Sequence, residues 1–320
     1  MKEEFSRLRA LLSQPTQDQT WARTLSQLLK HAHKLDEDTF CGVWLPYTEQ
    51  HAKDLMRPLR LFVQSLQELE EWHVLCPFAE LFLDLKGQAL GNEGCQELAD
   101  EPLLLHLRGL ILDKNKISIL GVRALAASSY LSNVRVLRLS RNQLGGSSCE
   151  DLVTSPHLSG VEELELGGNQ VGLVGCRWIG RTTQMTQLKV LGLSHNKISD
   201  ASCKALVESK NLSHLEVLDL RHNELTDRGC RSIAASYHLG RLRELMLAYN
   251  DIGPEGFKSV LLSRQLPEAV RLHFLSSVSR QRLLEESKER GLPDSDEFHD
   301  EETLVRRLWE DELQDKRENQ

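Results

Sequence analysis

Asparagine recurs at a fixed interval of 27 residues through the middle of the chain. Each asparagine closes a similar phrase, which runs from LILDKN at Leu110 to LMLAYN at Leu245. A fixed period of roughly 20 to 50 residues is the sequence signature of a repeat architecture. The six asparagines are Asn115, Asn142, Asn169, Asn196, Asn223 and Asn250.

Leucine occupies the fifth and the third positions before the asparagine in all seven repeats. An aliphatic residue follows two positions after the asparagine, and another follows ten positions after it. The first repeat carries Gln88 in the asparagine position. Leucines two residues apart predict a short strand with one buried face, and the later apolar positions have the spacing of a helix.

The phrase LxLxxNxI followed by GCxxL resembles the leucine-rich repeat of the ribonuclease-inhibitor-like class. The resemblance covers residues 79–278, as seven repeats of 27 residues and a terminal partial repeat. It implies a curved α/β solenoid with parallel strands on the concave face and short helices on the convex face. The curvature is expected because strands pack about 4.8 Å apart, whereas helices need about 8 to 10 Å.

Residues 1–78 lack the 27-residue interval and predict a helical N-terminal cap, with helical patterns broken at Pro15 and Pro58. This segment resembles the short helical segment beside the leucine-rich repeats of some bacterial proteins. The acidic-Trp-Leu-Glu phrase of those proteins is absent, because Leu45 and Pro46 follow Trp44. Residues 279–320 predict a C-terminal helix and an acidic tail with a short amphipathic helix at 304–313. We expect that last helix to cover the final repeat, with docking of a partner as the alternative.

The net charge of −8 is concentrated near the C-terminus. Residues 291–320 carry eleven acidic and four basic side chains, which contribute −7. This balance argues against a nucleic-acid partner and gives no reason to expect an anionic membrane surface. No apolar run reaches the roughly 18 residues of a membrane span, and the first residues are charged. We expect a cytoplasmic monomer.

Five of the seven cysteines share one repeat position, where the other two repeats carry Val122 and Phe257. Valine and phenylalanine in that position indicate a buried apolar column rather than a disulfide ladder or a metal site. The asparagine column is also interpreted as structural, because a carboxamide can serve backbone groups in a buried turn. The five cysteines are Cys95, Cys149, Cys176, Cys203 and Cys230.

Side chains on the exposed face of the strands form the candidate binding surface. Arginines in the third repeat and glutamates in the fourth predict either a salt-bridge ladder, with Arg138 opposite Glu165, or a surface for a partner. Arginine, tyrosine and methionine are enriched at protein interfaces. The candidate residues are Arg135, Arg138, Arg141, Glu163, Glu165, His195, Asp219, Arg221, His222, Met246 and Tyr249.

His195 and His222 lie close in the repeat to Asp219 and therefore suggest a zinc site as a second hypothesis, since imidazole and carboxylate are ordinary zinc ligands. Projection of one side chain from every strand makes such pairs common, so we predict no metal and no cofactor. The chain has no Walker loop, GxSxG or HExxH motif, which predicts no catalytic residues and a non-enzymatic scaffold or adaptor for a protein partner.

Two other functions remain open. The first is regulation of a small GTPase, because the GTPase-activating protein for Ran belongs to the same repeat class and supplies an arginine to its partner. No arginine of this chain aligns with that residue. The second is a structural element that assembles with copies of itself.

Overall fold

A computed structural model of the chain describes residues 59–72 and 79–270, together with positions 6–7, 10, 27–28 and 31. Most of the predicted N-terminal cap, the partial repeat after residue 271, the C-terminal helix and the amphipathic helix at 304–313 lie outside the described residues. The predictions for both caps therefore stay predictions.

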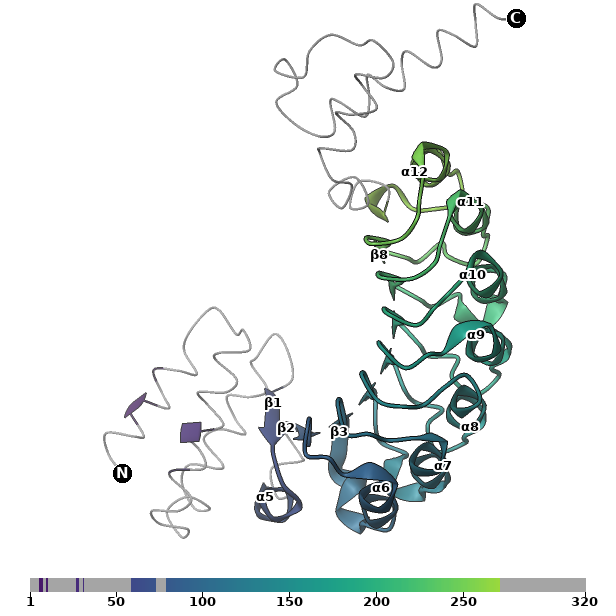
Figure 1. Cartoon of the computed structure of the whole chain (residues 1–320). Helices are drawn as coiled ribbons and strands as arrows, with labels where there is room; N and C mark the ends of the chain where they lie inside the picture. Colours follow the sequence, from purple (N-terminus) through teal and green to yellow (C-terminus); the bar gives the residue numbers. More distant parts are fainter. Residues whose placement is uncertain are drawn as a thin grey trace, which may run out of the picture. The chain divides into compact units, whose positions relative to one another are not determined.

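The chain divides into two compact units. The first unit holds residues 1–142 and 155–161, and the second holds residues 143–154 and 162–320. Within each unit, short parallel strands lie on one side and helices on the other (Figure 1). One strand and one helix alternate along the chain, which confirms the predicted α/β solenoid architecture.

In the first unit, strands β1 to β4 pair in parallel in chain order, and the register places Leu83 beside Leu110 and Leu110 beside Leu137. These leucines therefore form one row across the sheet. The elements of this unit are β1 (Leu59–Val63), α5 (Leu66–Trp72), β2 (Ala79–Asp84), α6 (Gly91–Ala99), η3 (Pro102–His106), β3 (Leu107–Ile111), α7 (Ile119–Ala127), η4 (Ser129–Leu131) and β4 (Val136–Arg138).

The second unit repeats this arrangement, with Leu164, Leu191, Leu218 and Leu245 in one row of the sheet. Helices α8 to α12 pack side by side in chain order. The elements of this unit are α8 (Ser148–Thr154), β5 (Glu163–Glu165), α9 (Gly172–Arg181), β6 (Val190–Gly192), α10 (Asp200–Val207), η5 (Lys210–Leu212), β7 (Val217–Asp219), α11 (Asp227–Ala234), β8 (Glu244–Met246) and α12 (Pro254–Leu261).

The predicted helix around Pro58 is wrong for residues 59–63, which form the strand β1. The strand pairs with β2, and Val63 lies beside Leu83. Leu66–Trp72 then forms a helix, as predicted. The strand falls outside the repeat interval because Val63 precedes its partner by 20 residues instead of 27. Its β-branched and aromatic side chains suit a pleated, half-buried surface.

Both leucine columns form the core. Every leucine in the fifth or third position before the asparagine is at most 4 % exposed. Full burial of such a side chain stabilises the fold by about 1.5–3 kcal/mol. The cysteine column lies on the helix side of the same core, and all five thiols are buried and free of disulfides. The cysteines therefore act as small apolar side chains.

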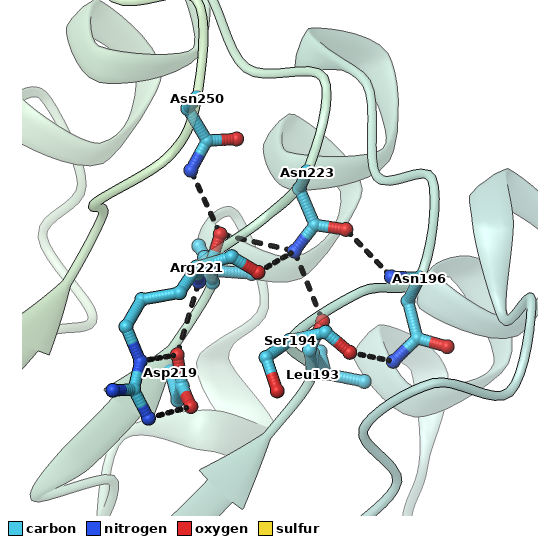
Figure 2. A network of polar contacts seen from close by, with 8 residues as sticks. Leu193, Ser194, Asn196, Asp219, Arg221, Asn223 and Asn250 are labelled. Carbon is cyan, nitrogen blue, oxygen red and sulfur yellow. Dashed lines mark hydrogen bonds and ion pairs between the residues drawn. The ribbon is translucent and has the colours of Figure 1, made fainter. Parts of the chain in front are cut away.

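The asparagine carboxamides link consecutive repeats. The Asn196 side-chain oxygen accepts hydrogen bonds from the backbone N–H groups of Asn169 (2.9 Å) and Val171 (3.1 Å). Its nitrogen donates to the carbonyl of Leu166 at 3.0 Å. Figure 2 shows the next steps of this asparagine ladder, in which Asn223 and Asn250 make equivalent contacts. The ladder satisfies backbone groups that would otherwise be buried without partners.

A second set of polar contacts caps α11 and α12, each from the preceding repeat. The Asp200 carboxylate accepts hydrogen bonds from the backbone N–H groups of Thr226 (2.8 Å) and Gly229 (2.9 Å), at the start of α11. Asp227 does the same for Gly253 and Gly256 at the start of α12. These contacts supply acceptors to N–H groups that a helix cannot satisfy internally.

Candidate functional site

The face of the strands that points away from the helices forms a continuous row of side chains in each unit, here called the strand-side surface. In β7 the central Leu218 is buried, so its neighbours Val217 and Asp219 point to the opposite face. The same alternation applies in β5, β6 and β8. Each repeat therefore contributes a few side chains to this surface.

The three predicted arginines of the first unit differ in their surroundings. Arg135 lies before β4, and its guanidinium donates to the backbone carbonyls of Ser132 (3.3 Å) and Val134 (3.2 Å). Arg138 ends β4 and Arg141 lies in the following turn, where both are exposed. Arg135 thus stabilises its own loop, which the sequence did not indicate. The pairing of Arg138 with Glu165 joins residues of different units and stays a prediction.

Glu163 and Glu165 lie at the two ends of β5. The Glu165 carboxylate extends over Gly192 of the adjacent strand β6, where an added Cβ atom would clash with it. The missing side chain at residue 192 therefore creates the space that the carboxylate fills. This glycine is a feature of the surface that the repeat pattern does not require.

Asp219 and Arg221 form a two-pronged ion pair. The guanidinium Nη2 lies 2.7 Å from Oδ2, and Nε lies 2.9 Å from Oδ1 (Figure 2). Asp219 is only 7 % exposed, whereas Arg221 is exposed. The hydrogen bond to Asp219 is the main cause of the raised pKa of Arg221, and the charges of Glu165 and Glu244 add to it. A partner would therefore meet Arg221 rather than Asp219.

Three rings from successive repeats stack beside this ion pair. The centroids of His195 and His222 lie 3.9 Å apart with an angle of 12° between the ring planes. His222 and Tyr249 follow at 4.1 Å and 8°. We call these three residues the aromatic column. Tyr249 is 74 % exposed, so the column presents a large apolar surface to solvent at its end.

The backbone of the aromatic column is left-handed, with φ of 55° at His195, 53° at His222 and 61° at Tyr249. The equivalent positions of other repeats, such as Arg141 and Gly168, have the same conformation. It is therefore a requirement of the turn and not of the site. A non-glycine residue in this region costs of order 1 kcal/mol. The repeat pattern does not predict this backbone conformation, because glycine and large residues both occur at this position.

The pKa of His222 is lowered from its ordinary value of 6.5. Desolvation is the largest cause, and the nearby His195 and Arg221 act in the same direction, while Asp219 opposes them. A lowered pKa favours the neutral form of the ring. A neutral imidazole can then stack between two other rings without charge repulsion.

The geometry of the two histidines is poor for the zinc site considered above. Their rings lie face to face, whereas ligation requires ring nitrogens of separate residues to converge on one point. Within residues 59–72 and 79–270, no group of three or more His, Cys, Asp or Glu side chains is placed to hold a metal ion.

Met246 and Glu244 complete the strand-side surface of the second unit. Both belong to β8 and are half-buried, and Met246 lies beside Asp219 in the register. The structure therefore brings together the predicted residues His195, Asp219, Arg221, His222, Met246 and Tyr249. Glu244 occupies the same repeat position as Glu163 but was not among the predicted residues.

The fold and this surface define an α/β repeat protein with strands on one side and helices on the other. The chain matches the family described as "Leucine Rich repeat" at residues 184–207, 211–234 and 242–261. These segments coincide with repeats of the second unit and confirm the predicted leucine-rich repeat there. Leucine-rich-repeat domains commonly mediate protein–protein interaction.

Among solved structures, one similar chain is described as belonging to the crystal structure of a TLR13–ssRNA13 complex. The two sequences are 20 % identical, and the alignment covers 68 % of this chain and 33 % of that chain with a TM-score of 0.36. This chain thus spans about a third of that protein's length, and a similarity at this level carries no argument about function. No curated protein matches the chain. Within the described residues, no helix has the length and apolar character needed to cross a membrane.

Proposed function

We propose that the chain is a non-enzymatic scaffold or adaptor that binds a protein partner on its strand-side surface, with the aromatic column as the main contact. The stacking of His195, His222 and Tyr249 is the observation that carries this proposal. Tyrosine is among the residue types that carry most of the binding energy at protein interfaces. The charged members of the surface then set the orientation of the partner.

Rigidity is the first argument for the aromatic column as the main contact. An exposed side chain loses rotamer freedom on binding, at a cost of about 0.5–1.5 kcal/mol. His222 is already held between two parallel rings at 3.9 and 4.1 Å. The column therefore offers a preorganised apolar surface, and less entropy is lost when a partner covers it.

The neighbouring ion pair is the second argument. Arg221 is exposed, yet two hydrogen bonds to Asp219 fix its guanidinium. A fixed guanidinium can interact with a carboxylate or an aromatic ring of the partner in a defined geometry. Met246 supplies an adaptable apolar side chain close by. This combination of apolar centre and charged surroundings is typical of binding surfaces.

Affinity capture of the full chain from native lysate, quantified by mass spectrometry, tests the proposal. Tyr249→Ala removes the most exposed ring of the column and is expected to reduce capture of a specific partner by about tenfold or more. Tyr237→Ala is the matched control, because Tyr237 is 79 % exposed but lies in the loop after α11. Capture should be unchanged in this variant.

Charge reversal extends the test to the rest of the surface. Arg138→Glu and Glu165→Lys should each weaken capture of the same partner while circular dichroism remains that of the unchanged protein. If capture survives the tyrosine substitution and both charge reversals, the strand-side surface is not the binding surface and the proposal is wrong.

A further inference from the structure

The helix side of the second unit carries a column of basic side chains that the strand-side surface does not explain. Arg177, Lys204, Arg231 and Lys258 occupy the same repeat position, eight residues after the asparagine position, on α9, α10, α11 and α12. Each directly follows the buried cysteine position. We call these four residues the basic column.

These side chains are available at the surface. Arg177, Lys204 and Arg231 are exposed, and Lys258 is half-buried. Since α9 packs on α10, α10 on α11 and α11 on α12, the four charges lie in sequence across adjacent helices. At the usual interaxial distance of about 8 to 10 Å, the column spans roughly 24 to 30 Å.

The charge of these helices is unbalanced. Besides the column they carry Arg181 and Arg228, whereas their acidic residues are Asp200, Asp227 and Glu255. Asp200 and Asp227 accept hydrogen bonds at the starts of the next helices. Lys204 pairs with Glu208 at 3.6 Å and Lys258 pairs with Glu255 at 3.9 Å, and both distances are long for an ion pair. Lys204 and Glu208 are both exposed, and an exposed pair of this kind contributes little to stability.

The chain itself contains a segment with the complementary charge. Residues 294–302 hold Asp294, Asp296, Glu297, Asp300, Glu301 and Glu302, with no lysine or arginine among them. Nine residues in an extended conformation span about 30 Å, which matches the length of the basic column. The 23 residues from 271 to 293 could extend over more than twice that distance, so they do not restrict the approach.

We infer that the acidic segment 294–302 docks on the basic column across α9 to α12 in the same molecule. The contact is electrostatic, because carboxylates recur along the segment as lysine and arginine recur along the column. The apolar stripe of residues 304–313 lies beyond the segment and takes no part. This contact is independent of the proposed binding on the strand side.

Zero-length cross-linking of the full chain with a carbodiimide tests the inference, because the reagent joins a lysine amine to a carboxylate only when they are in contact. Peptide mass spectrometry should find Lys204 and Lys258 joined to residues 294–302. Lys197, which is exposed but outside the column, is the internal control and should show no such product. At 0.5 M salt, where the screening length falls to roughly 4 Å, the products should largely disappear.

Charge reversal provides the matched comparison. Arg177→Glu combined with Arg231→Glu should reduce the cross-links of Lys204 about tenfold. Arg241→Glu combined with Arg264→Glu makes the same change of charge at exposed arginines outside these helices. This variant should leave the cross-links of Lys204 unchanged. A 1:1 mixture of ¹⁴N and ¹⁵N protein distinguishes cross-links within a molecule from those between molecules. Products between copies, equal labelling of Lys197, or no products at low salt would each overturn the inference.

Discussion

At the scale of single residues, each asparagine of the ladder performs two roles. The oxygen of Asn196 accepts from two backbone N–H groups of the preceding repeat, and its nitrogen donates to carbonyls such as that of Leu166. Only a carboxamide provides both functions at this size. The regular interval of the asparagines is thus explained by the backbone groups that each one satisfies.

Asn196→Ala should lower the free energy of unfolding by about 2–4 kcal/mol, because it leaves the N–H groups of Asn169 and Val171 buried without acceptors. Denaturant titration followed by circular dichroism measures the change. Asn211→Ala is the control, since this half-buried asparagine belongs to η5 and lies outside the ladder. An equal loss in both variants would contradict the account.

The pH behaviour of His222 provides a second prediction. The pKa of His222 is lowered in the folded protein. As the pH falls through 6.5, the ring therefore takes up a proton more readily when it is unstacked and solvated than when it is stacked. Acidification in that range thus favours opening of the stack. Nuclear magnetic resonance of the ring should give a midpoint below 6.5. In His195→Gln, which removes one of the causes, the midpoint should rise. A midpoint at or above 6.5 in the unchanged protein would show that His222 is not desolvated and stacked as the structure places it.

Residue identity alone could not predict several details of the site. The sequence places Arg135 and Asp219 on the strand-side surface, but the structure shows Arg135 bound to its own loop and Asp219 covered by Arg221. A repeat position gives the direction in which the strand projects a residue. It does not give the conformation of a long side chain, which depends on neighbours such as Gly192 that leave space.

At the scale of elements, adjacent repeats complete each other's helices. Asp200 supplies the acceptor for the start of α11, and Gly229 brings its N–H to within 2.9 Å of that carboxylate. A Cβ atom at residue 229 would lie 2.6 Å from the Asp200 oxygen. The glycine is therefore required by the close approach of two repeats.

Gly229→Ala should destabilise the fold by about 1–2 kcal/mol, because the added methyl group displaces the capping carboxylate. Gly240→Ala should be neutral or slightly stabilising, since nothing lies within 4 Å of the added atom and the unfolded chain loses entropy. Thermal unfolding of the two variants measures the difference. A Gly229→Ala protein as stable as the unchanged one would argue against the capping role of Asp200.

The elements could be predicted where the interval holds and not where it fails. Leucine columns two residues apart indicate the strands β2 to β8, because burial of one face follows from the alternation. The strand β1 was mistaken for helix because its spacing to β2 is 20 residues. The capping contacts of Asp200 and Asp227 were also missed, since their repeat position holds different residue types in other repeats.

At the scale of the whole molecule, the fold protects its cysteine column. Burial raises the pKa of Cys149 and of Cys230 to about 12. Both side chains therefore stay in the thiol form, which does not react as a nucleophile. Per-residue alkylation with mass spectrometry should find both unmodified in the native protein and modified in denaturant. Rapid native labelling of Cys149 would mean that the core around α8 is open.

The two sides of the second unit differ in their balance of charge. The strand side holds Glu163, Glu165, Asp219 and Glu244 with Arg221, whereas α9 to α12 carry six basic and three acidic residues. Two surfaces of different charge suit two different contacts, one with a protein partner and one with the acidic segment of the chain. Substitutions on one side are therefore expected to leave the contact on the other side intact.

Hydroxyl-radical footprinting of the full chain with and without the captured partner tests the central claim most directly. Methionine, tyrosine and histidine side chains report their own exposure in this measurement. Met246, His222 and Tyr249 are expected to become protected on binding, while the exposed Tyr237 in the loop after α11 keeps its reactivity. Protection of Tyr237 with unchanged reactivity of Tyr249 would place the partner elsewhere and contradict the account.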